Sequence, residues 1–276
     1  MRPRVTVLLG FCNSELHLPR ALESLWYQSF SDFEVVLIDD GSTDKSYEVA
    51  SKYAAIDDRF RLYVNDLNQG LTATLNRAIS LAKGSLLARM DADDICEPDR
   101  LEIQTNYLAK RPVVDIVGSW AWDIDDKGNK EALRKVPTEH KAILSALPWY
   151  NPFIHPTVVM RADLVWRLGG YDSRFRTSQD WDLWFRAASK GAHFANIGEP
   201  LLHYRTGSGY LARKSFAYRL NEFTIRRKGT KLCHAPLIAR YSAIISLVLA
   251  VLPQSLFRQL KRLDPRNQAT LQGSSQ

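Results

Sequence analysis

Residues 86–101 read LLARMDADDICEPDRL, an apolar run that turns abruptly acidic. Three carboxylates stand just beyond the run: Asp91, Asp93 and Asp94. The apolar residues predict a buried strand over Ser85–Met90, and Pro98 with Asp99 indicates the start of a helix. Carboxylates crowded at a strand end repel one another unless a cation neutralises them, and Mg²⁺ or Mn²⁺ suits such oxygen ligands. The alternative is a solvated acidic turn that caps the next helix.

The first 112 residues alternate apolar strands with amphipathic helices. The expected strands are Val5–Leu9, Phe33–Ile38, Arg61–Val64 and Ser85–Met90, and the expected helices are His17–Gln28, Ser46–Ala55 and Leu71–Ala82. Repeated strand–helix units predict an α/β fold with a mainly parallel sheet and helices on both faces. Ligands of such sheets bind beyond the carboxyl ends of the strands. Asp40, which follows the second strand, should therefore lie at the same edge as Asp91 and Asp93.

The alternation fades after about residue 112, and no Ser/Gly-rich linker divides the chain. The segments expected beyond that point are a strand at Val113–Trp122, a turn at Asp125–Asn129, a hairpin partner at Ala132–Val136, a helix at His140–Leu147, an apolar segment at His155–Met160, a sharp turn at Gly169–Asp172 and a helix at Gln179–Lys190. We expect one domain over residues 1–230, made of the halves 1–112 and 113–230, and a tail over 231–276.

The formal net charge of +7 is unevenly distributed. Residues 201–276 carry 13 Lys/Arg against two acids, so they are net +11 and residues 1–200 are net −4. The uncharged stretch Tyr241–Phe257 lies inside this basic region, but 17 residues interrupted by Pro253 make a poor spanning helix. Apolar residues with basic flanks favour an interfacial segment on an anionic membrane. The alternative is a helix that packs on the protein's own core.

The cysteines and the N-terminal residues bear on the cellular compartment. The three cysteines are far apart and show no CxxC spacing, which argues against disulfides and structural zinc and favours a reducing compartment. The apolar run near the N-terminus breaks after Cys12 without a small-residue cleavage site, so it predicts a first strand rather than a signal peptide. We therefore expect a cytoplasmic protein that can lie at the inner face of the cell membrane.

Residues 4 to about 205 resemble a family 2 glycosyltransferase of GT-A fold. The motifs that carry the resemblance are RVTVLLGFCNSE (4–15), FEVVLIDDGSTDKS (33–46), NQGLTATLNRAISLAKGSLLARMDADDICEPDRL (68–101), HPTVVMR (155–161) and GGYDSRFRTSQDWDLWFRAASKG (169–191). Each motif is weakly specific alone, but the combination is very specific. The resemblance implies a nucleotide-sugar donor, an acceptor hydroxyl and a Mn²⁺ or Mg²⁺ ion. It does not extend to the basic tail.

The resemblance also implies which residues hold the donor. Asp40 would bind the uracil or thymine base, since a carboxylate at a strand end can accept the imide N–H. Asp93 would be the direct metal ligand; Asp91 is also assigned to the metal site and would lie nearer the ribose or a metal-bound water. The other residues assigned to the nucleotide-sugar site are Asp39, Asn13, Asn68 and Arg205. An ion held there would stabilise the charge that grows on the leaving nucleoside diphosphate.

Asp180 opens the helix of the second half, where the helix dipole favours the ionised carboxylate. The resemblance implies that Asp180 is the general base that takes the proton from the acceptor hydroxyl; a plain helix cap is the alternative. His155 and Trp181 are assigned to the acceptor and diphosphate side, and Trp181 could offer a face to a sugar ring. For His155 the alternative is a buried, hydrogen-bonded core residue. Arg186 is expected to pair with a carboxylate.

Three positions depart from the family pattern. Cys12 stands where many relatives carry an aromatic residue that stacks on the base, unless Phe11 replaces it. Gln179 replaces the acidic residue that commonly precedes the base. Gly207 replaces a histidine that often follows Tyr-Arg, so a third metal ligand from that loop is not expected.

The sequence thus predicts an inverting glycosyltransferase that acts in surface polysaccharide or glycolipid synthesis. UDP-sugars are favoured over dTDP- or GDP-sugars as donors, and a glycan or a polyprenyl-linked lipid is expected as acceptor. One alternative is a degenerate carbohydrate- or nucleotide-binding module, against which the retained aspartates argue. A sugar-nucleotide nucleotidyltransferase would carry a Gly-rich basic loop after the first strand, which LLGFCNSELHLPR lacks. Nucleic-acid binding by the tail is disfavoured, because its apolar insert fits a membrane better.

Overall fold

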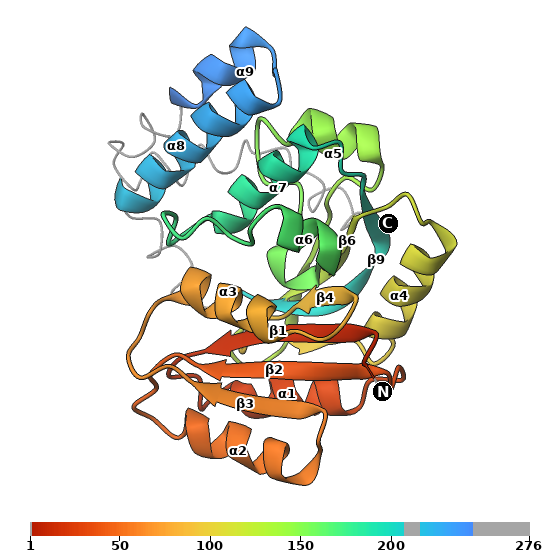
Figure 1. The fold of residues 1–276 in the computed structure, drawn as a ribbon, viewed down its shortest axis with the longest axis vertical. Helices are drawn as coiled ribbons and strands as arrows, with labels where there is room; N and C mark the ends of the chain where they lie inside the picture. The colour runs from red at the N-terminus through yellow and green to blue at the C-terminus, as the bar shows by residue number, and fades with distance from the viewer. Residues whose placement is uncertain (1, 207–215, 245–276) are drawn as a thin grey trace.

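The computed structural model describes residues 2–206 and 216–244, which form one nine-stranded sheet flanked by helices (Figure 1). The strands are β1 (Val5–Phe11), β2 (Phe33–Asp39), β3 (Phe60–Val64), β4 (Leu86–Arg89), β5 (Ile95–Cys96), β6 (Ile116–Ile124), β7 (Lys130–Arg134), β8 (Val159–Arg161) and β9 (Phe194–Arg205). The helices are α1 (Leu18–Trp26), α2 (Ser46–Ile56), α3 (Leu71–Leu81), α4 (Arg100–Lys110), α5 (His140–Ala146), α6 (Ala162–Arg167), α7 (Gln179–Ser189), α8 (Phe216–Leu232) and α9 (Leu237–Ser242), with the 3₁₀ turn η1 (His155–Thr157).

The strand order is β3-β2-β1-β4-β8-β6-β9-β5, and β7 pairs with β6 beside this path. The expected α/β class with helices on both faces is confirmed. The parallel arrangement holds for β1 to β4 and for β6 with β9, whereas β8 pairs antiparallel with both β4 and β6, and β7 with β6 and β5 with β9 are also antiparallel. Most paired residues are therefore parallel, as expected, and every antiparallel pair involves a strand of the second half. The physical reason is visible at β6 and β7, where a tight turn replaces the crossover helix that a parallel pair needs.

Side chains of β1 alternate between two cores on opposite faces of the sheet. Val7 and Leu9 point into one core beneath α1, and Leu8 points into the other beneath α3. Figure 1 shows α3 on one side of β1 and β2, with α1 and α2 on the other. Because both faces are covered, β2 is buried along its whole length. The carboxyl ends of β1, β2 and β4 thus remain as the edge of the parallel strands where polar residues can gather.

The hydrophobic pattern did not predict the strand β9, nor the longer helix α8. The strand spans twelve residues, but Gly198-Glu199-Pro200 interrupts its apolar character. Its register with β6 shifts next to Pro200, which pairs with Trp120. A bulge tolerates proline because the missing N–H needs no ladder partner there. The consequence is functional, since β9 carries Arg205 back to the acidic end of β4.

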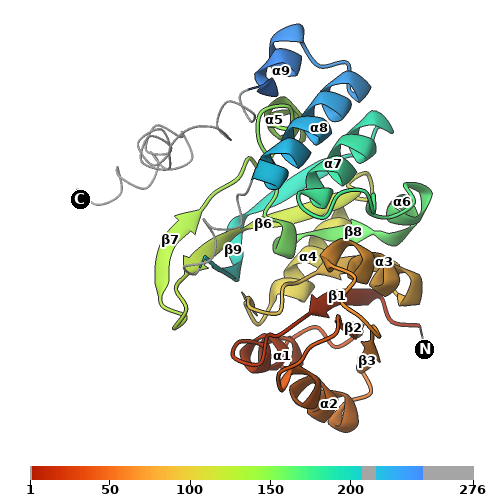
Figure 2. The same ribbon diagram turned by 90° about the vertical axis from the view of Figure 1, so that its left-hand side faces the viewer.

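The helices α8 and α9 cover the second half of the protein, and α8 runs along α7 (Figure 2). Ile225 is fully buried in this contact, and Gly229 lets the helix approach the ring of Phe185. Among the residues that the structure describes, no helix combines the length and the apolar character needed to cross a bilayer. Gly207 and residues 245–257 of the predicted interfacial segment lie outside the described residues.

Candidate active site

The three carboxylates after β4 form one cluster. Each of Asp91, Asp93 and Asp94 offers an oxygen, and these oxygens all lie within 4.8 Å of one another. Asp94 is fully buried; its Oδ1 accepts a hydrogen bond from the backbone N–H of Arg205 at 2.8 Å, and its Oδ2 has no hydrogen-bond partner among the described residues. Burial raises the pKa of Asp94 well above its usual range, and the charges of Asp91 and Asp93 raise it further. An all-oxygen cluster with this charge crowding fits a hard divalent cation.

The helix-cap interpretation of these carboxylates is wrong. The helix α4 begins at Arg100, and the residue at its N-cap position is Asp99. The strand β5 separates Asp94 from that helix and pairs with β9. Asp94 therefore belongs to the acidic cluster, a role that the prediction assigned only to Asp91 and Asp93.

Arg89 is the last residue of β4, and its side chain is almost fully buried. It forms an ion pair with Asp91, while its Nε has no hydrogen-bond partner among the described residues. Burial alone would lower the pKa of Arg89, but the charge and hydrogen bond of Asp91, together with the charges of Tyr171 and Asp94, raise it overall, so the guanidinium stays charged. Its charge also acts on His155, Tyr171 and Asp180. Arg89 therefore links the acidic cluster to groups from the second half of the chain.

Asp180 lies in the first turn of α7 and is 7% exposed. The amide of Asn151 donates a hydrogen bond of 2.5 Å to its Oδ2. Burial raises the pKa of Asp180 above its ordinary value, while the hydrogen bonds from Asn151 and from the backbone of Trp181 and the charge of Arg89 work in the opposite direction. A carboxyl group with a raised pKa and one oxygen held in place suits proton transfer near neutral pH. Ser178 occupies the N-cap position, so Asp180 is not the helix cap.

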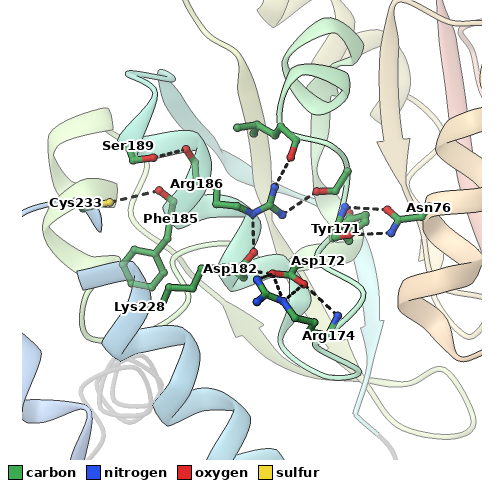
Figure 3. Close-up of polar contacts among 12 residues, drawn as sticks. Asn76, Tyr171, Asp172, Arg174, Asp182, Phe185, Arg186, Ser189, Lys228 and Cys233 are labelled. Atoms are coloured by element: carbon green, nitrogen blue, oxygen red, sulfur yellow. Dashed lines mark hydrogen bonds and ion pairs between the residues drawn. The ribbon is translucent and has the colours of Figure 1, made fainter. Parts of the chain in front are cut away.

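The half-buried His155 and the buried Tyr171 form a hydrogen-bonded pair. The His155 Nε2 lies 2.8 Å from the Tyr171 hydroxyl. Burial and the charge of Arg89 hold the pKa of His155 well below its usual range, so the imidazole is neutral. Asn76 fixes Tyr171 by two backbone hydrogen bonds of 2.8 Å, which are drawn in Figure 3. This arrangement matches the core interpretation of His155, although the residue borders Arg89.

Trp181 does not offer a face to a sugar. It is 5% exposed, its Nε1 donates to the Leu147 carbonyl at 2.9 Å, and its ring stacks on Phe185. The first residues of α7 lie toward the core and α8 packs over them, so Trp181 is buried, as Trp184 is. Arg186 pairs with Asp182 at 2.6 Å, as expected (Figure 3).

Asp40 and Asp39 lie at the end of β2, at the same edge as the acidic cluster. Since β1 lies between β2 and β4, Asp40 is two strand spacings, about 10 Å, from β4. Both oxygens of Asp40 already accept hydrogen bonds: Oδ1 from the Asn65 amide and the backbone of Gln69, and Oδ2 from the backbone of Gly70 at 2.8 Å. Asp39 accepts a backbone hydrogen bond from the following turn. Asp40 thus orders the loop before α3.

The residues assigned to the base lie around the ends of β1 and β2. Phe11 is 3% exposed in the core beneath α1, so it cannot replace the missing aromatic residue at Cys12. The Asn68 amide donates to the Cys12 sulfur at 3.2 Å, which brings these two positions together. Asn13 has a left-handed backbone, and its side-chain oxygen accepts a hydrogen bond from the Thr43 N–H at 2.8 Å. These contacts hold two loops together at the expected edge.

Arg205 ends β9 beside the acidic cluster. Its Nε donates to the Asp93 carbonyl at 2.8 Å, and a further nitrogen donates to the Asp125 carbonyl. The remaining nitrogen, Nη2, is buried and has no hydrogen-bond partner among the described residues. A buried cationic donor next to a carboxylate cluster is suited to an anionic group that a metal ion also binds.

Comparisons with known proteins now identify the fold and the family. The sequence profile described as Glycosyl transferase family 2 matches residues 6–169. The putative glycosyltransferase EpsE of Bacillus subtilis (strain 168) is 33% identical over 269 residues, which are 96% of this chain and 96% of that protein. The chain belongs to glycosyltransferase family 2.

A further relative and two solved structures of other proteins agree with that assignment. The Escherichia coli protein named UDP-Gal:alpha-D-GlcNAc-diphosphoundecaprenol beta-1,3-galactosyltransferase is 30% identical over 212 residues, or 74% of each chain. S. aureus TarS 1-349 in complex with UDP-GlcNAc superposes with a TM-score of 0.69 at 17% identity, covering 90% of this chain and 72% of that one. The Pyrobaculum calidifontis mannosyltransferase PcManGT, in complex with GDP-Man and Mn²⁺, gives 0.58 at 20% identity, with 98% and 84% covered. These structures support the GT-A fold.

Four residues of the glycosyltransferase site escaped the prediction: Arg89, Asp94, Asn151 and Tyr171. Only Arg89 left a signal, because a charged side chain inside an apolar strand requires a partner. Asn151 lies in a loop without periodicity, and Asp94 looked like a turn residue. The profile match ends before Asp180, so the role of that carboxylate rests on the geometry around it.

Proposed function

We propose that this glycosyltransferase transfers a sugar, with inversion, from a UDP-sugar to a hydroxyl group of a lipid-linked or growing glycan. The supporting observation is that the buried Arg89 interacts with both Asp91 and Asp180, so the acidic cluster and the buried carboxylate belong to one site. The first would hold the donor diphosphate and the second would meet the acceptor.

Asp93, Asp91 and Asp94 would hold a Mn²⁺ or Mg²⁺ ion, which as a Lewis acid would stabilise the diphosphate leaving group. The Nη2 of Arg205 would donate to the same diphosphate. Asp40, Asp39, Asn13 and Asn68 would line the base and ribose end of the donor.

Asp180 would act as the general base. As an oxygen of its carboxylate takes the proton of the acceptor hydroxyl, the acceptor oxygen forms a bond to the anomeric carbon and the bond from that carbon to the diphosphate oxygen breaks. The attack comes from the side opposite the leaving group, so one displacement inverts the configuration. Asn151 would hold the Oδ2 of Asp180 and so keep the carboxylate in place while it accepts the proton.

The named relatives guide the choice of substrates. The Escherichia coli relative is named for UDP-Gal and a diphosphoundecaprenol acceptor, and the TarS structure contains UDP-GlcNAc. PcManGT contains GDP-Man but superposes less well, with a TM-score of 0.58 against 0.69 for TarS, so we place UDP-sugars before GDP- and dTDP-sugars. An acceptor with a polyprenyl chain would bring the enzyme to the cytoplasmic face of the membrane as a peripheral protein.

Two variants distinguish the proposed role of Asp180 in catalysis from that of Asp93 in metal binding. Asp180→Asn should lower kcat by 10²- to 10⁴-fold, the usual contribution of a general base, and leave UDP affinity within about twofold. Asp93→Ala should abolish the Mn²⁺-dependent part of UDP binding, measured by thermal shift and calorimetry. The control is Asp163→Asn, an exposed carboxylate on α6 that should change neither property. Near-normal turnover of Asp180→Asn, or Mn²⁺-dependent UDP binding by Asp93→Ala, would refute the assignment.

A further inference from the structure

Exposed apolar side chains gather on the last two helices. Six of the sixteen large hydrophobic residues exposed in the described part of the chain lie on or beside α8 and α9: Leu220, Leu232, Leu237, Ile238, Tyr241 and Ile244. Ile238 is 70% exposed and Tyr241 is 68% exposed. Such a concentration on two adjacent helices is typical of an interaction surface rather than of scattered surface residues.

The same surface carries cations. A groove of about 390 Å³ runs between α8 and α9, with Phe223, Leu237, Tyr241 and Ile244 as its apolar lining. Three cationic side chains complete the lining: Arg227, Lys231 and Arg240. The one acid between residues 216 and 244 is Glu222, and it pairs with Arg219 at 3.0 Å. Within the described residues, Arg227 and Lys231 therefore face solvent without a carboxylate partner.

The opposite side of α8 contacts the helix that carries Asp180. Lys228 Nζ lies 3.0 Å from Asp182 and 3.3 Å from Asp172, and these side chains are labelled in Figure 3. The guanidinium of Arg226 lies over the Trp181 ring at 5.8 Å. One helix thus presents apolar and cationic residues outward and holds α7 on its inner side.

We propose that the outer surface of α8 and α9 docks on an anionic phospholipid membrane. The apolar side chains would enter the interface, and Arg227 and Lys231 would lie among the lipid phosphates. Because α8 also holds α7, docking would present the Asp180 side of the enzyme to an acceptor anchored in the same membrane. This last consequence rests on the proposed function; the docking itself does not.

Charge complementarity selects the membrane over two other occupants. Residues 245–257 are uncharged and residues 258–276 carry four Lys/Arg and one Asp, so the chain's own tail brings no net negative charge to neutralise the cationic groove. A second copy of the surface would bring the same positive charge. Anionic headgroups neutralise both the groove and the tail, and their attraction adds to the burial of the apolar residues.

The test is co-sedimentation of the full chain with vesicles of phosphatidylglycerol and phosphatidylcholine, and with phosphatidylcholine alone. Wild-type protein should bind only the anionic vesicles, and less at high salt. Arg227→Glu with Lys231→Glu should weaken binding at least 25-fold, since each lost basic residue weakens binding about fivefold. A second double variant, Leu237→Ser with Tyr241→Ser, should also bind anionic vesicles more weakly than wild type, and this loss should be seen in low salt. Lys52→Glu with Lys110→Glu, exposed positions on α2 and α4, matches the charge change and should have a small effect.

The proposal is overturned if the surface variants bind anionic vesicles as well as wild type does. It is also overturned if light scattering shows that wild type is a dimer and that the surface variants are monomers. UDP and Mn²⁺ thermal shifts measured on the same samples separate the two hypotheses. Retained nucleotide binding without vesicle binding would reject the docking surface alone. Vesicle binding without any nucleotide binding would reject the proposed function and leave the docking surface standing.

Discussion

Asp180 and Asp94 are both buried carboxyl groups, but their neighbours differ. Asp180 has donors around it, namely the Asn151 amide, the Trp181 N–H and the charge of Arg89, whereas Asp94 lies among other carboxylates. Donors stabilise the ionised form, and like charges destabilise it. Asp180 is therefore suited to accept a proton, and Asp94 to share a cation.

Asn151→Ala should lower kcat about tenfold or more at neutral pH, because a hydrogen bond to a charged group is lost. The hydrogen bond favours the ionised carboxylate, so its loss raises the pKa of Asp180 further. The acid limb of the kcat/KM profile should then move to higher pH, with little change in the KM for the donor. The substitution alters neither Arg89 nor Tyr171, which interact electrostatically with Asp180.

Asn221→Ala is the matched control for this prediction. Asn221 donates to Thr177 at 3.1 Å, in the segment that leads into α7, but does not contact Asp180. Its pH profile should superpose on that of wild type. If Asn151→Ala keeps the wild-type acid limb, the amide only supports the fold.

Asp94→Asn should stabilise the metal-free protein by about 1 kcal/mol, or roughly 2–4 °C in Tm, because it removes a buried charge that repels its neighbours. The raised pKa of Asp94 leads to the same expectation. A carboxyl group whose pKa is raised in the folded state stabilises the protein at low pH, and this contribution is lost as the pH rises through the folded-state pKa. The variant should also lose most of the Tm increase that Mn²⁺ produces. The control is Asp126→Asn at an exposed position, which should change neither the Tm nor its increase with Mn²⁺. If Asp94→Asn instead lowers the Tm of the metal-free protein, the ionised Asp94 carboxylate stabilises the fold.

At the scale of elements, β9 and α8 decide where the site residues lie. The strand β9 crosses the sheet beside β6 and ends with Arg205 next to Asp93. The helix α8 clamps α7 through Lys228 and Arg226. Both elements come late in the chain, so the site is complete only when they have packed.

Gly229→Ala should destabilise the protein by about 1–2 kcal/mol. A Cβ at this position would lie 2.2 Å from the ring of Phe185, which is itself buried, and overpacking outweighs the better helix propensity of alanine. Urea denaturation measures the change. Thr224→Ala on the exposed side of α8 should stay within about 0.5 kcal/mol of wild type, and equal stability of the two variants would mean that α7 and α8 can separate slightly without cost.

At the scale of the molecule, the two halves share one sheet and both cores. The strand β4 of the first half pairs with β8 of the second, and each core contains residues from both halves, such as Val7 with Val159 and Leu8 with Trp184. The expectation of one domain over residues 1–230 remains a prediction, and this continuity favours it.

One cooperative unfolding transition should follow from the shared cores. Differential scanning calorimetry of the full chain should give a ratio of calorimetric to van't Hoff enthalpy of about one. UDP with Mn²⁺ should shift the whole transition upward, since the ligand binds groups that both halves hold in place. Two resolved transitions, with only one shifted by ligand, would show that the halves unfold separately.

Particular residues show how far prediction from sequence reached. The elements of the first 112 residues and the positions of Asp40, Asp91 and Asp93 at one edge followed from periodicity, because side-chain alternation reports burial directly. The strand β9 was missed because Gly198 and Pro200 break its pattern. Trp181 was misjudged because helical period places a residue on a face without saying which face the neighbouring helix covers.

The secondary structure of the first half, the acidic strand end and the family could all be predicted from the residues along the chain, since these depend on local periodicity and on motifs. Three relations follow from the folded chain alone: Arg89 pairs with Asp91 while its charge also acts on Asp180, Asn151 holds Asp180, and α8 exposes Arg227 and Lys231. Those relations join residues dozens of positions apart, and they arise from which surfaces bury one another. A pattern of neighbours along the chain carries no such information.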